Sequence, residues 1–468
     1  MAELYEKLNK FNETHGIHSE NPSKTTNLIS FSTVIEYIDL NFLIRDFNIK
    51  TDFFYWNISG KKISFLAFDP IVNITENGIL RVEKTDEKIS SLRKNFINNW
   101  KENNLGNLPL FFGGMKFAPN QKSNVWKDFS DSDWFVPRFL ILNRAGKSYL
   151  IVNYFSDEIN STALRNKLEN ILKILTVNKS VHSPIPESDV RIIDFKEHNG
   201  WNEKVILALE NISKGSIQKI VLSREVEWEL SGEPDLSYIL KTLSERYPKC
   251  YVFAFKRNNS IFFGASPEKL AKISNGWIEA DALAGSISRG KTEEEDKILE
   301  TELLNSKKNL HEQNAVVEFI TSSLKKISNE IIFDEKPIIR KLPNIQHLWT
   351  PIKAKLKNEM PLFSILKELH PTPAICGAPW MNALKSITEM EEHDRGLYAG
   401  IVGWFSFEDE AEFAVAIRSA LYKEKKIFAY AGCGIVEGSE PQEEFNETEL
   451  KLKPIKNLFI YENSYQPQ

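Results

Sequence analysis

The sequence has few cysteines and no long apolar run, and each absence narrows what the protein can be. Its three cysteines, Cys250, Cys376 and Cys433, lie far apart and include no CxxC spacing. This argues against a zinc site or a disulfide framework and fits a reducing compartment. No apolar run approaches the roughly 18 residues needed to cross a bilayer, and the N-terminus lacks a basic segment followed by an apolar one. We therefore expect a cytoplasmic protein that does not enter a membrane.

The chain also lacks an excess of either charge. Lys and Arg number 59 against 64 Asp and Glu, a net charge of -5, with no long run of one sign. This balance argues against a broad basic face for nucleic acid and favours a small-molecule substrate. The 468 residues are 42% hydrophobic and 26% charged, an ordinary globular composition that can form one large or two moderate cores.

The first part of the chain has the pattern of a β-rich region. Residues 27–155 contain short alternating or apolar runs separated by Gly, Pro, Asn and Asp, which is typical of strands. A helix is expected at 157–175, followed by a linker with two prolines at 177–188. We place a boundary at this linker, between a β-rich half, residues 1–190, and a second half, residues 191–468.

The second half mixes helical and strand patterns. The sequence predicts helices at 194–213 and 292–327, and a charged helix closes the chain. It predicts strands at 217–230, 250–256, 261–264, 400–407, 411–419 and 426–431.

Residues 430–451 join a glycine-rich loop to that closing charged helix. Ser439 can cap the helix, and at about 100° per residue Glu444, Glu447 and Lys451 fall on one face. Two carboxylates and an ammonium group pointing the same way could bind a metal and a small anion. The alternative is a solvated helix with ordinary pairing of Glu447 with Lys451.

Two residues are candidates for acid and base chemistry. Lys219 lies on the same strand face as Ile217 and Val221, and burial lowers the pKa of a lysine until its amine can act as a general base. Its stem could instead pack while its ammonium group reaches the sheet edge. Glu268 follows a Gly turn and a Ser-Pro start to an expected short helix, where it could simply complement the helix dipole. A catalytic role requires it to face Lys219.

Further candidates could bind a metal or an anion. Glu312 lies on a helix beside His311, but no HExxH spacing follows. Carboxylates from distant helices suit Mg²⁺ better than zinc, although a solvated helical glutamate remains the alternative. Arg418 ends an apolar strand, where it suits bidentate binding of a carboxylate or a structural ion pair. The amides of Gly285, Gly432 and Gly434 could also approach an anion.

Taken in this order, these segments resemble the chorismate-utilising enzyme family, which includes anthranilate, aminodeoxychorismate, isochorismate and salicylate synthases. The resemblance covers most of residues 195–455, and residues 112–117 are similar to the family's more variable β-rich half. It implies an α/β (α+β) fold of large antiparallel sheets flanked by helices, like that of anthranilate synthase component I. The segments that carry it are 219–224, 264–270, 283–286, 311–312, 343–347, 369–374, 395–400, 413–418 and 430–451.

The resemblance implies a role for each candidate. Glu312 and Glu447, with Glu444 close by, would bind Mg²⁺, which would hold the ring carboxylate of chorismate. The enolpyruvyl carboxylate would bind to the guanidinium of Arg418 and to the backbone amides around Gly432 and Gly434. Lys451 would add positive charge near the metal. These and the other implied substrate-binding residues are Arg418, Gly432, Gly434, Lys451, Gly285, Ser286, His347, Ala374 and Ile375.

Lysine at position 219 resembles the family's water-activating branch, since the ammonia-using branch typically carries glutamine. Lys219 would deprotonate water for attack at C2 of the ring while Glu268 protonates the leaving C4 hydroxyl, which gives isochorismate. The aliphatic Ile375 favours this isomerase over a salicylate synthase, and a non-catalytic chorismate-binding homologue is a further alternative. The resemblance implies no glutaminase partner and a monomer, and it leaves open whether the product serves menaquinone or siderophore biosynthesis.

Three departures from the family pattern concern the surroundings of the site. Gln313 replaces the usual histidine after Glu312, Lys307 and Lys308 add positive charge, and Cys433 replaces a common alanine.

Overall fold

The strands show the predicted alternation, and each of their faces reaches a different hydrophobic core. On β2 (Phe53–Ile58), Phe54 and Trp56 lie in one core, whereas Phe53 and Tyr55 lie in the other. Successive side chains of a strand point to opposite faces, so both faces of this strand are buried. The computed structural model describes residues 2–15, 26–46, 51–103, 105–106, 108–120, 123–177, 190–197, 200–343, 345–357, 360–407 and 410–459.

Two long strands, β3 (Ile63–Glu76) and β6 (Ser132–Arg144), belong to two sheets at once. They pair with each other along their whole length, with a bulge between Pro70 and Val72. The first residues of β6 pair with β5 (Phe111–Met115) and its last residues with β7 (Lys147–Phe155). The strands therefore pass from one sheet into the other, which explains how the described strands form one connected hydrogen-bonded network.

Both sheets are almost entirely antiparallel, as expected. In the described part of the chain, the pair β1–β4 is the parallel exception. The first sheet runs through β4 (Phe96–Asn98), β1 (Leu28–Ile35), β7, β6, β3, β2, β10 (Tyr251–Arg257), β11 (Ser260–Ser266), β20 (Ser419–Lys423), β21 (Lys426–Ile435) and β9 (Lys219–Leu230), with β8 (Ile192–Glu197) and β17 (Gly377–Ala378) on β9. The second runs through β6, β5, β18 (Ile401–Phe405), β19 (Ala411–Val415), β12 (Lys269–Ser274), β13 (Trp277–Ser288) and β16 (Ile345–Leu356), with β14 (Ser328–Phe333) and β15 (Ile338–Lys341) on β16.

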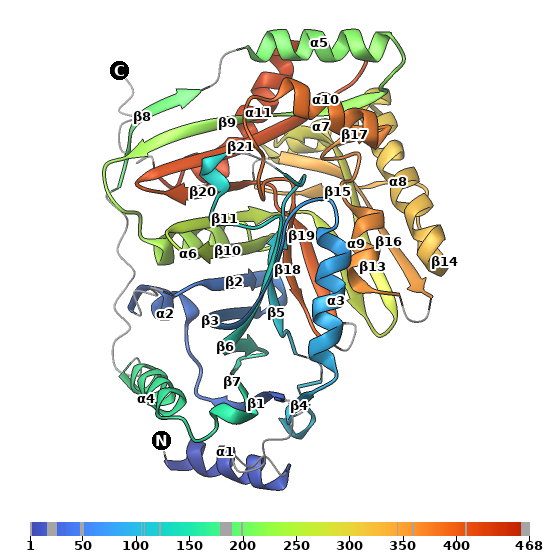
Figure 1. Ribbon diagram of the computed structural model, residues 1–468. Coiled ribbons are helices and arrows are strands. Elements are labelled where there is room, and N and C mark those ends of the chain that lie inside the picture. The colour runs from blue at the N-terminus through green and yellow to red at the C-terminus, as the bar shows by residue number, and fades with distance from the viewer. Residues whose placement is uncertain are drawn as a thin grey trace.

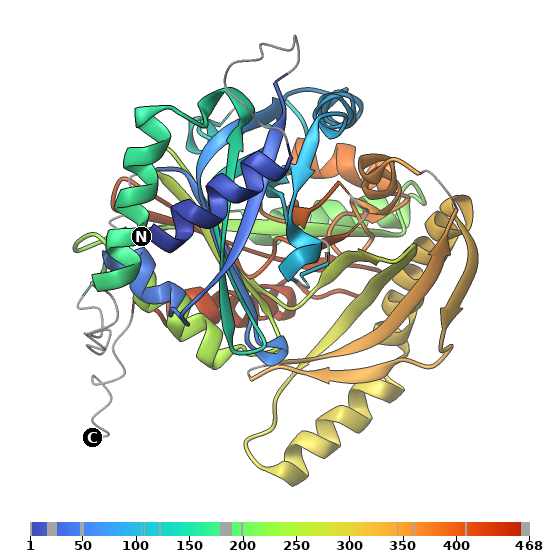
Figure 2. The same cartoon turned by 90° about the horizontal axis from the view of Figure 1, so that it is seen from below.

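Helices cover the outer faces of these sheets. Figure 1 shows α5 (Trp201–Ser213), α10 (Trp380–Met390) and α11 (Pro441–Lys456) around β9 and β21, and α8 (Lys307–Ile327) beside β13 and β16. Figure 2 shows α1 (Ala2–Thr14) and α4 (Thr162–Val177) over the N-terminal strands. The remaining helices are α2 (Leu40–Asp46), α3 (Arg81–Arg93), α6 (Leu236–Arg246), α7 (Glu293–Asn305) and α9 (Leu362–Leu369). No helix among the described residues is both long and apolar enough to span a membrane.

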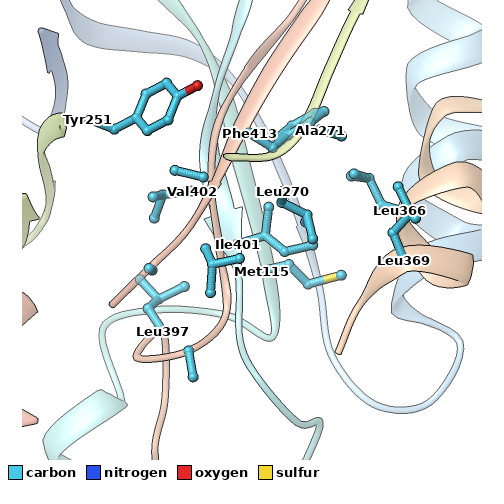
Figure 3. Packing of buried hydrophobic residues seen from close by; sticks show 14 of the residues in the cluster. Met115, Tyr251, Leu270, Ala271, Leu366, Leu369, Leu397, Ile401, Val402 and Phe413 are labelled. Atoms are coloured by element: carbon cyan, nitrogen blue, oxygen red, sulfur yellow. The ribbon is translucent and has the colours of Figure 1, made fainter. Parts of the chain in front are cut away.

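The larger core joins the two sheets and the helices α8 and α9. Met115, Leu270, Ile401 and Leu366 come from four different elements and pack together there (Figure 3). The second core lies between the first sheet and helices that include α1, α2, α4 and α6.

Several predicted elements differ from the structure. The helix expected at 194–213 begins only at Trp201, because residues up to Glu197 form β8 and pair with β9. The helix expected at 292–327 is two helices, and Ser306 between them caps α8 by accepting a hydrogen bond from the Asn309 amide. Most of the linker predicted at 177–188 lies outside the described residues.

Three corrections concern the neighbourhood of the site. Ser439 does not cap α11: Glu440 holds the N-cap position, and Ser439 Oγ accepts a hydrogen bond from the Val436 amide instead. No helix follows Ser266, because Lys269 already begins β12. The strand expected at 411–419 is β19 and the start of β20, separated by a corner that contains Arg418.

The two predicted halves share both sheets. β2 pairs with β10, and β5 pairs with β18. Strands from residues 1–190 are thus central members of sheets that residues 191–468 complete. The boundary near residue 190 stays a prediction about chain organisation.

Candidate active site

The candidate site lies where the chain crosses from one sheet to the other. Glu268 is in the connection from β11 in the first sheet to β12 in the second, and Arg418 is in the connection from β19 back to β20. The two connections run side by side, since the Val415 amide donates to the Glu268 carbonyl and the Ala265 amide donates to the Arg418 carbonyl. Long-range strand pairing therefore brings an acidic and a basic side chain into one place.

One cavity collects nearly all the predicted site residues. Its walls come from both sheets and from α8 and α11. The predicted residues that line it are Glu268, Gly285, Ser286, Glu312, His347, Ala374, Ile375, Arg418, Gly432, Gly434, Glu447 and Lys451. Lys219 and Glu444 are not among its lining residues, but Lys219 pairs with Glu312 and Glu444 lies beside Cys433, both of which line it.

Lys219 forms an ion pair with Glu312. Their Nζ and Oε1 atoms are 2.6 Å apart, and the Lys219 side chain is only 4% exposed. The alternative in which this lysine reaches solvent at the sheet edge is therefore wrong. Burial alone would raise the pKa of the Glu312 carboxyl, but the Lys219 ammonium brings that pKa below its ordinary value.

Gly434 leaves room beside β21 for the ion pair of Lys219 and Glu312. A Cβ at position 434 would lie 2.7 Å from Lys219 Cε and 3.0 Å from Glu312 Oε1. Contacts that short would force the ion pair to move, so a residue without a side chain is required there.

The other two carboxylates also face lysines. Lys451 Nζ lies 2.6 Å from Glu447 Oε1 and donates a hydrogen bond of 2.9 Å to the Gly432 carbonyl. Glu444 is buried, and Lys308 Nζ lies 3.2 Å from its Oε1. Lys308, one of the departures from the family pattern, thus neutralises the carboxylate next to the cavity.

Glu268 is a buried carboxyl that keeps its proton. Burial raises its pKa to about 8, the nearby Asp281 carboxylate adds to the rise, and the Lys219 ammonium opposes it. Its backbone amide donates to Ser266 Oγ at 3.2 Å. Because no helix begins here, the helix-dipole role is wrong, and the side chain can donate a proton at neutral pH.

Arg418 is a buried guanidinium facing the cavity. Its Nη2 lies 3.4 Å from His347 Nε2, and His347 Nδ1 lies 2.8 Å from Ser286 Oγ. Burial lowers the pKa of His347 well below its ordinary value, and the Arg418 guanidinium lowers it further. Within the described ranges no carboxylate lies at ion-pair distance from Arg418, so the structural ion pair is not formed and the guanidinium is available to an anion.

The backbone of Gly432 and Gly434 faces away from the neighbouring strand. They lie opposite Ser223 and Val221 of β9, whose amides donate to other segments. Residues in such an antiparallel pair both point their N–H and C=O groups away from each other. The Gly432 carbonyl accordingly meets Lys451, and the amides of both glycines lie on the open edge of β21.

Sequence reasoning missed two aromatic residues of the cavity. Tyr398 and Tyr430 both line it, with ring centroids 5.2 Å apart and nearly parallel rings. Tyr398 lies in the segment 395–400 that carried part of the resemblance, and Tyr430 opens the glycine-rich loop. Both tyrosines can be read from the sequence, but nothing in their sequence pattern distinguishes a residue of a cavity wall from an ordinary core residue.

The carboxylates have the chemistry of a Mg²⁺ site without forming a closed cage. No three His, Cys, Asp or Glu side chains of the described chain are grouped so that they could hold an ion by themselves. Mg²⁺ usually takes only one or two carboxylates together with oxygens of water or an anionic substrate. Glu312 and Glu447 both line the cavity and fit that requirement, whereas Glu444 does not line it. All three carboxylates are paired with lysines in this structure.

Comparison with known proteins finds relatives over nearly the whole length of the chain. The family model described as "Chorismate binding enzyme" matches residues 12–459. Isochorismate synthase MenF of Bacillus subtilis is 32% identical over 453 residues, 94% of this chain and 95% of that one. The salicylate biosynthesis isochorismate synthase of Pseudomonas aeruginosa is 33% identical over 352 residues, 74% of each chain.

Solved structures share the fold. The menaquinone-specific isochorismate synthase MenF of Escherichia coli superposes with a TM-score of 0.78 at 23% identity, covering 97% of this chain and 100% of that one. Anthranilate synthase component I of Streptococcus pneumoniae gives a TM-score of 0.71 at 24% identity, covering 84% and 92%. With a family model that spans nearly its whole length, the chain belongs to the chorismate-binding enzyme family, and the relative that matches 94% of it is an isochorismate synthase.

Proposed function

We propose that this enzyme converts chorismate to isochorismate. The observation that carries the proposal is that one buried cavity holds a neutral carboxyl, Glu268, together with a guanidinium, Arg418, that has no carboxylate partner among the described residues. Such a cavity suits an anionic substrate that must lose a hydroxyl group. The names of the relatives, isochorismate synthases among them, support the same reaction.

The cavity can bind both carboxylates of chorismate. Arg418 and the free amides of Gly432 and Gly434 would take the enolpyruvyl carboxylate, because a buried guanidinium without a counter-ion strongly favours an anion. Lys451 would add positive charge near the ring carboxylate. Gly285, Ser286 and His347 line the same cavity and complete its polar wall.

Glu312 and Glu447 would hold Mg²⁺, with Glu444 beside them. When bound, the ion would supply positive charge to the ring carboxylate of the substrate and so bind and orient it. The lysines that now face these carboxylates, Lys219 and Lys451, would then be released from them.

The reaction exchanges one hydroxyl for another. Lys219, in its neutral amine form, takes a proton from water as the water oxygen bonds to C2 of the ring. Both ring double bonds shift, from C1=C2 to C6=C1 and from C5=C6 to C4=C5, and the bond from C4 to its hydroxyl breaks. Glu268 gives its proton to that leaving hydroxyl, which departs as water. The products are isochorismate and one water, so no redox partner is needed, and since ammonia takes no part we infer that no glutaminase subunit is required.

Ile375 supports release of isochorismate over further breakdown. Its side chain is buried in the cavity wall and offers no polar atom to assist elimination of pyruvate. A salicylate synthase would need that second step.

One experiment tests the proposal. The purified protein is incubated with chorismate and Mg²⁺ in ¹⁸O-labelled water, and the products are separated by chromatography with mass detection. We expect isochorismate with one ¹⁸O atom, and no product from Lys219→Ala or after chelation of the metal. Salicylate with pyruvate would instead identify a lyase, and unchanged chorismate that still raises the melting temperature would identify a binding protein.

A further inference from the structure

Arg395 is a fully buried cation directly behind the cavity wall. It follows α10 in sequence and forms a bidentate pair with Glu391: Nε donates to Oε2 at 2.8 Å and Nη2 donates to Oε1 at 2.6 Å. The two side chains are only 2% and 3% exposed. A bidentate pair this buried has a defined geometry, because both planar groups are held by two parallel bonds.

The remaining donors of Arg395 reach two residues of the cavity wall. Nη1 donates to the Ile375 carbonyl at 2.8 Å, and Nη2 donates to the Val221 carbonyl at 2.7 Å. Val221 belongs to β9, whereas Ile375 lies in the connection between α9 and β17. One side chain thus joins two segments that meet at the cavity and are far apart in sequence.

The same network holds the strand that carries Lys219. Glu391 accepts hydrogen bonds from the amide and the hydroxyl of Ser223, at 2.7 and 2.9 Å. Lys219 lies two residues before Val221 on β9 and Ser223 two residues after it, so the network holds the strand at two positions close to Lys219. The Val221 amide also donates to Cys376, next to Ile375, at 2.9 Å.

We propose that Arg395 is a positioning residue of this active site. It does not line the cavity, and it fixes the distance between the strand of Lys219 and the wall formed by Ile375. The inference rests on the proposed function, since that function gives Lys219 its role as base and Ile375 its role in product release. The competing explanation is that the pair of Arg395 and Glu391 only stabilises the fold.

A matched pair of variants separates these explanations. Arg257 is also buried and donates from Nε and Nη2 to Asp133 Oδ1 at 3.0 and 2.5 Å. Among the described residues, none of its hydrogen-bond partners or ring contacts lines the cavity. Arg395 binds both carboxylate oxygens of Glu391, whereas Arg257 directs two nitrogens to one oxygen of Asp133. Lysine at either position loses the fixed fork of the guanidinium. We expect Arg395→Lys to lower kcat by about 10- to 100-fold with KM changed less than about 3-fold, because small misplacement of a catalytic group is costly. Arg257→Lys should lower the melting temperature comparably and leave kcat within about 2-fold.

Product analysis adds a second readout. If the wall at Ile375 loosens, the share of pyruvate among the products should rise in Arg395→Lys and not in Arg257→Lys. Equal kcat values and equal product ratios for the two variants, at matched loss of stability, would overturn the proposal. Should Arg395→Lys fail to fold, Glu391→Gln removes the charge of the partner while keeping its shape, and the same comparison applies.

Wild-type enzyme is measured in the same assay, so that failure of the proposed function can be told apart from failure of the positioning role of Arg395. Absence of isochorismate from the wild type would refute the isomerase assignment alone. The ratio of variant to wild-type kcat, measured on whichever product the wild type forms, would still decide whether Arg395 positions the site.

Discussion

Glu268 carries its proton at neutral pH because the fold buries it. Its pKa is about 8 in the folded protein, against 4.5 for an ordinary glutamate. The folded state therefore binds this proton more tightly than the unfolded chain does. The resulting stabilisation is fully present below pH 4.5 and is lost as pH rises through about 8.

We predict that the free energy of unfolding of the metal-free wild type falls relative to that of Glu268→Gln between pH 4.5 and about 8. The change should be on the order of 3 to 5 kcal/mol. Urea unfolding at a series of pH values measures it, and parallel curves for the two proteins would contradict a buried neutral acid. Glu268→Gln should also abolish turnover while chorismate still binds. The kcat/KM of the wild type should decline above about pH 8 as the acid of the free enzyme loses its proton.

The pair of Lys219 and Glu312 gives a second prediction at this scale. Removing the ammonium leaves a largely buried carboxylate without a partner, which costs several kcal/mol in comparable pairs. In the absence of metal, Lys219→Met should lose about 2 to 4 kcal/mol of unfolding free energy, and adding Glu312→Gln should restore most of it. A double-mutant cycle by denaturant unfolding measures the coupling, and strictly additive losses would show that the pair contributes nothing.

At the scale of elements, β21 can lie close to the ion pair of Lys219 and Glu312 because residue 434 is a glycine. We predict that Gly434→Ala lowers kcat/KM by about 10- to 100-fold and costs about 1 to 3 kcal/mol in stability. The added Cβ would lie 2.7 Å from Lys219 Cε, so the pair must shift. Steady-state kinetics and thermal unfolding measure both effects.

Gly232→Ala is the matched control for this substitution. A Cβ at Gly232 would meet only Val190 Cγ2 at 3.6 Å, an ordinary contact. Its activity and stability should stay close to wild type. Equal kinetics for the two variants would mean that Gly434 is not needed for space.

The elements also show where local patterns mislead. Residues 194–197 continue a helical pattern, yet they form β8 because β9 offers an edge to pair with. Residues 411–419 read as one strand, yet the chain turns at Arg418, whose φ of 53° is uncommon for an arginine. In both places a partner far along the chain overrides the local preference.

At the scale of the whole molecule, the two halves of the chain complete each other's sheets. Residues 191–468 alone would expose the edge of β10 that pairs with β2 and the edge of β18 that pairs with β5. They would also expose the larger core, which contains aromatic residues of both halves, such as Trp134 and Phe255. Exposed edges and apolar surface of this kind favour aggregation over folding.

We therefore predict that neither residues 1–190 nor residues 191–468 fold when expressed separately. Circular dichroism, size-exclusion chromatography and urea unfolding of each half test this. A cooperative unfolding transition in either isolated half would contradict it. The full chain, measured alongside, should unfold cooperatively.

The sequence by itself determined the family, the antiparallel class of the sheets and most of the predicted residues that line the cavity. Glu268, Glu312, Arg418 and Gly434 lie in local motifs whose residue types and order are readable without coordinates, and strand alternation is likewise local. These features depend on neighbours in the chain.

Only the tertiary structure decided what those residues are next to. Lys219 meets Glu312 93 positions away, Lys308 meets Glu444, and Tyr398 stacks on Tyr430. The same holds for the raised pKa of Glu268 and for the contacts of Arg395 with two walls of the cavity. Ion pairing, burial and pKa depend on groups that long-range strand pairing brings together, and no local pattern in the chain specifies those partners.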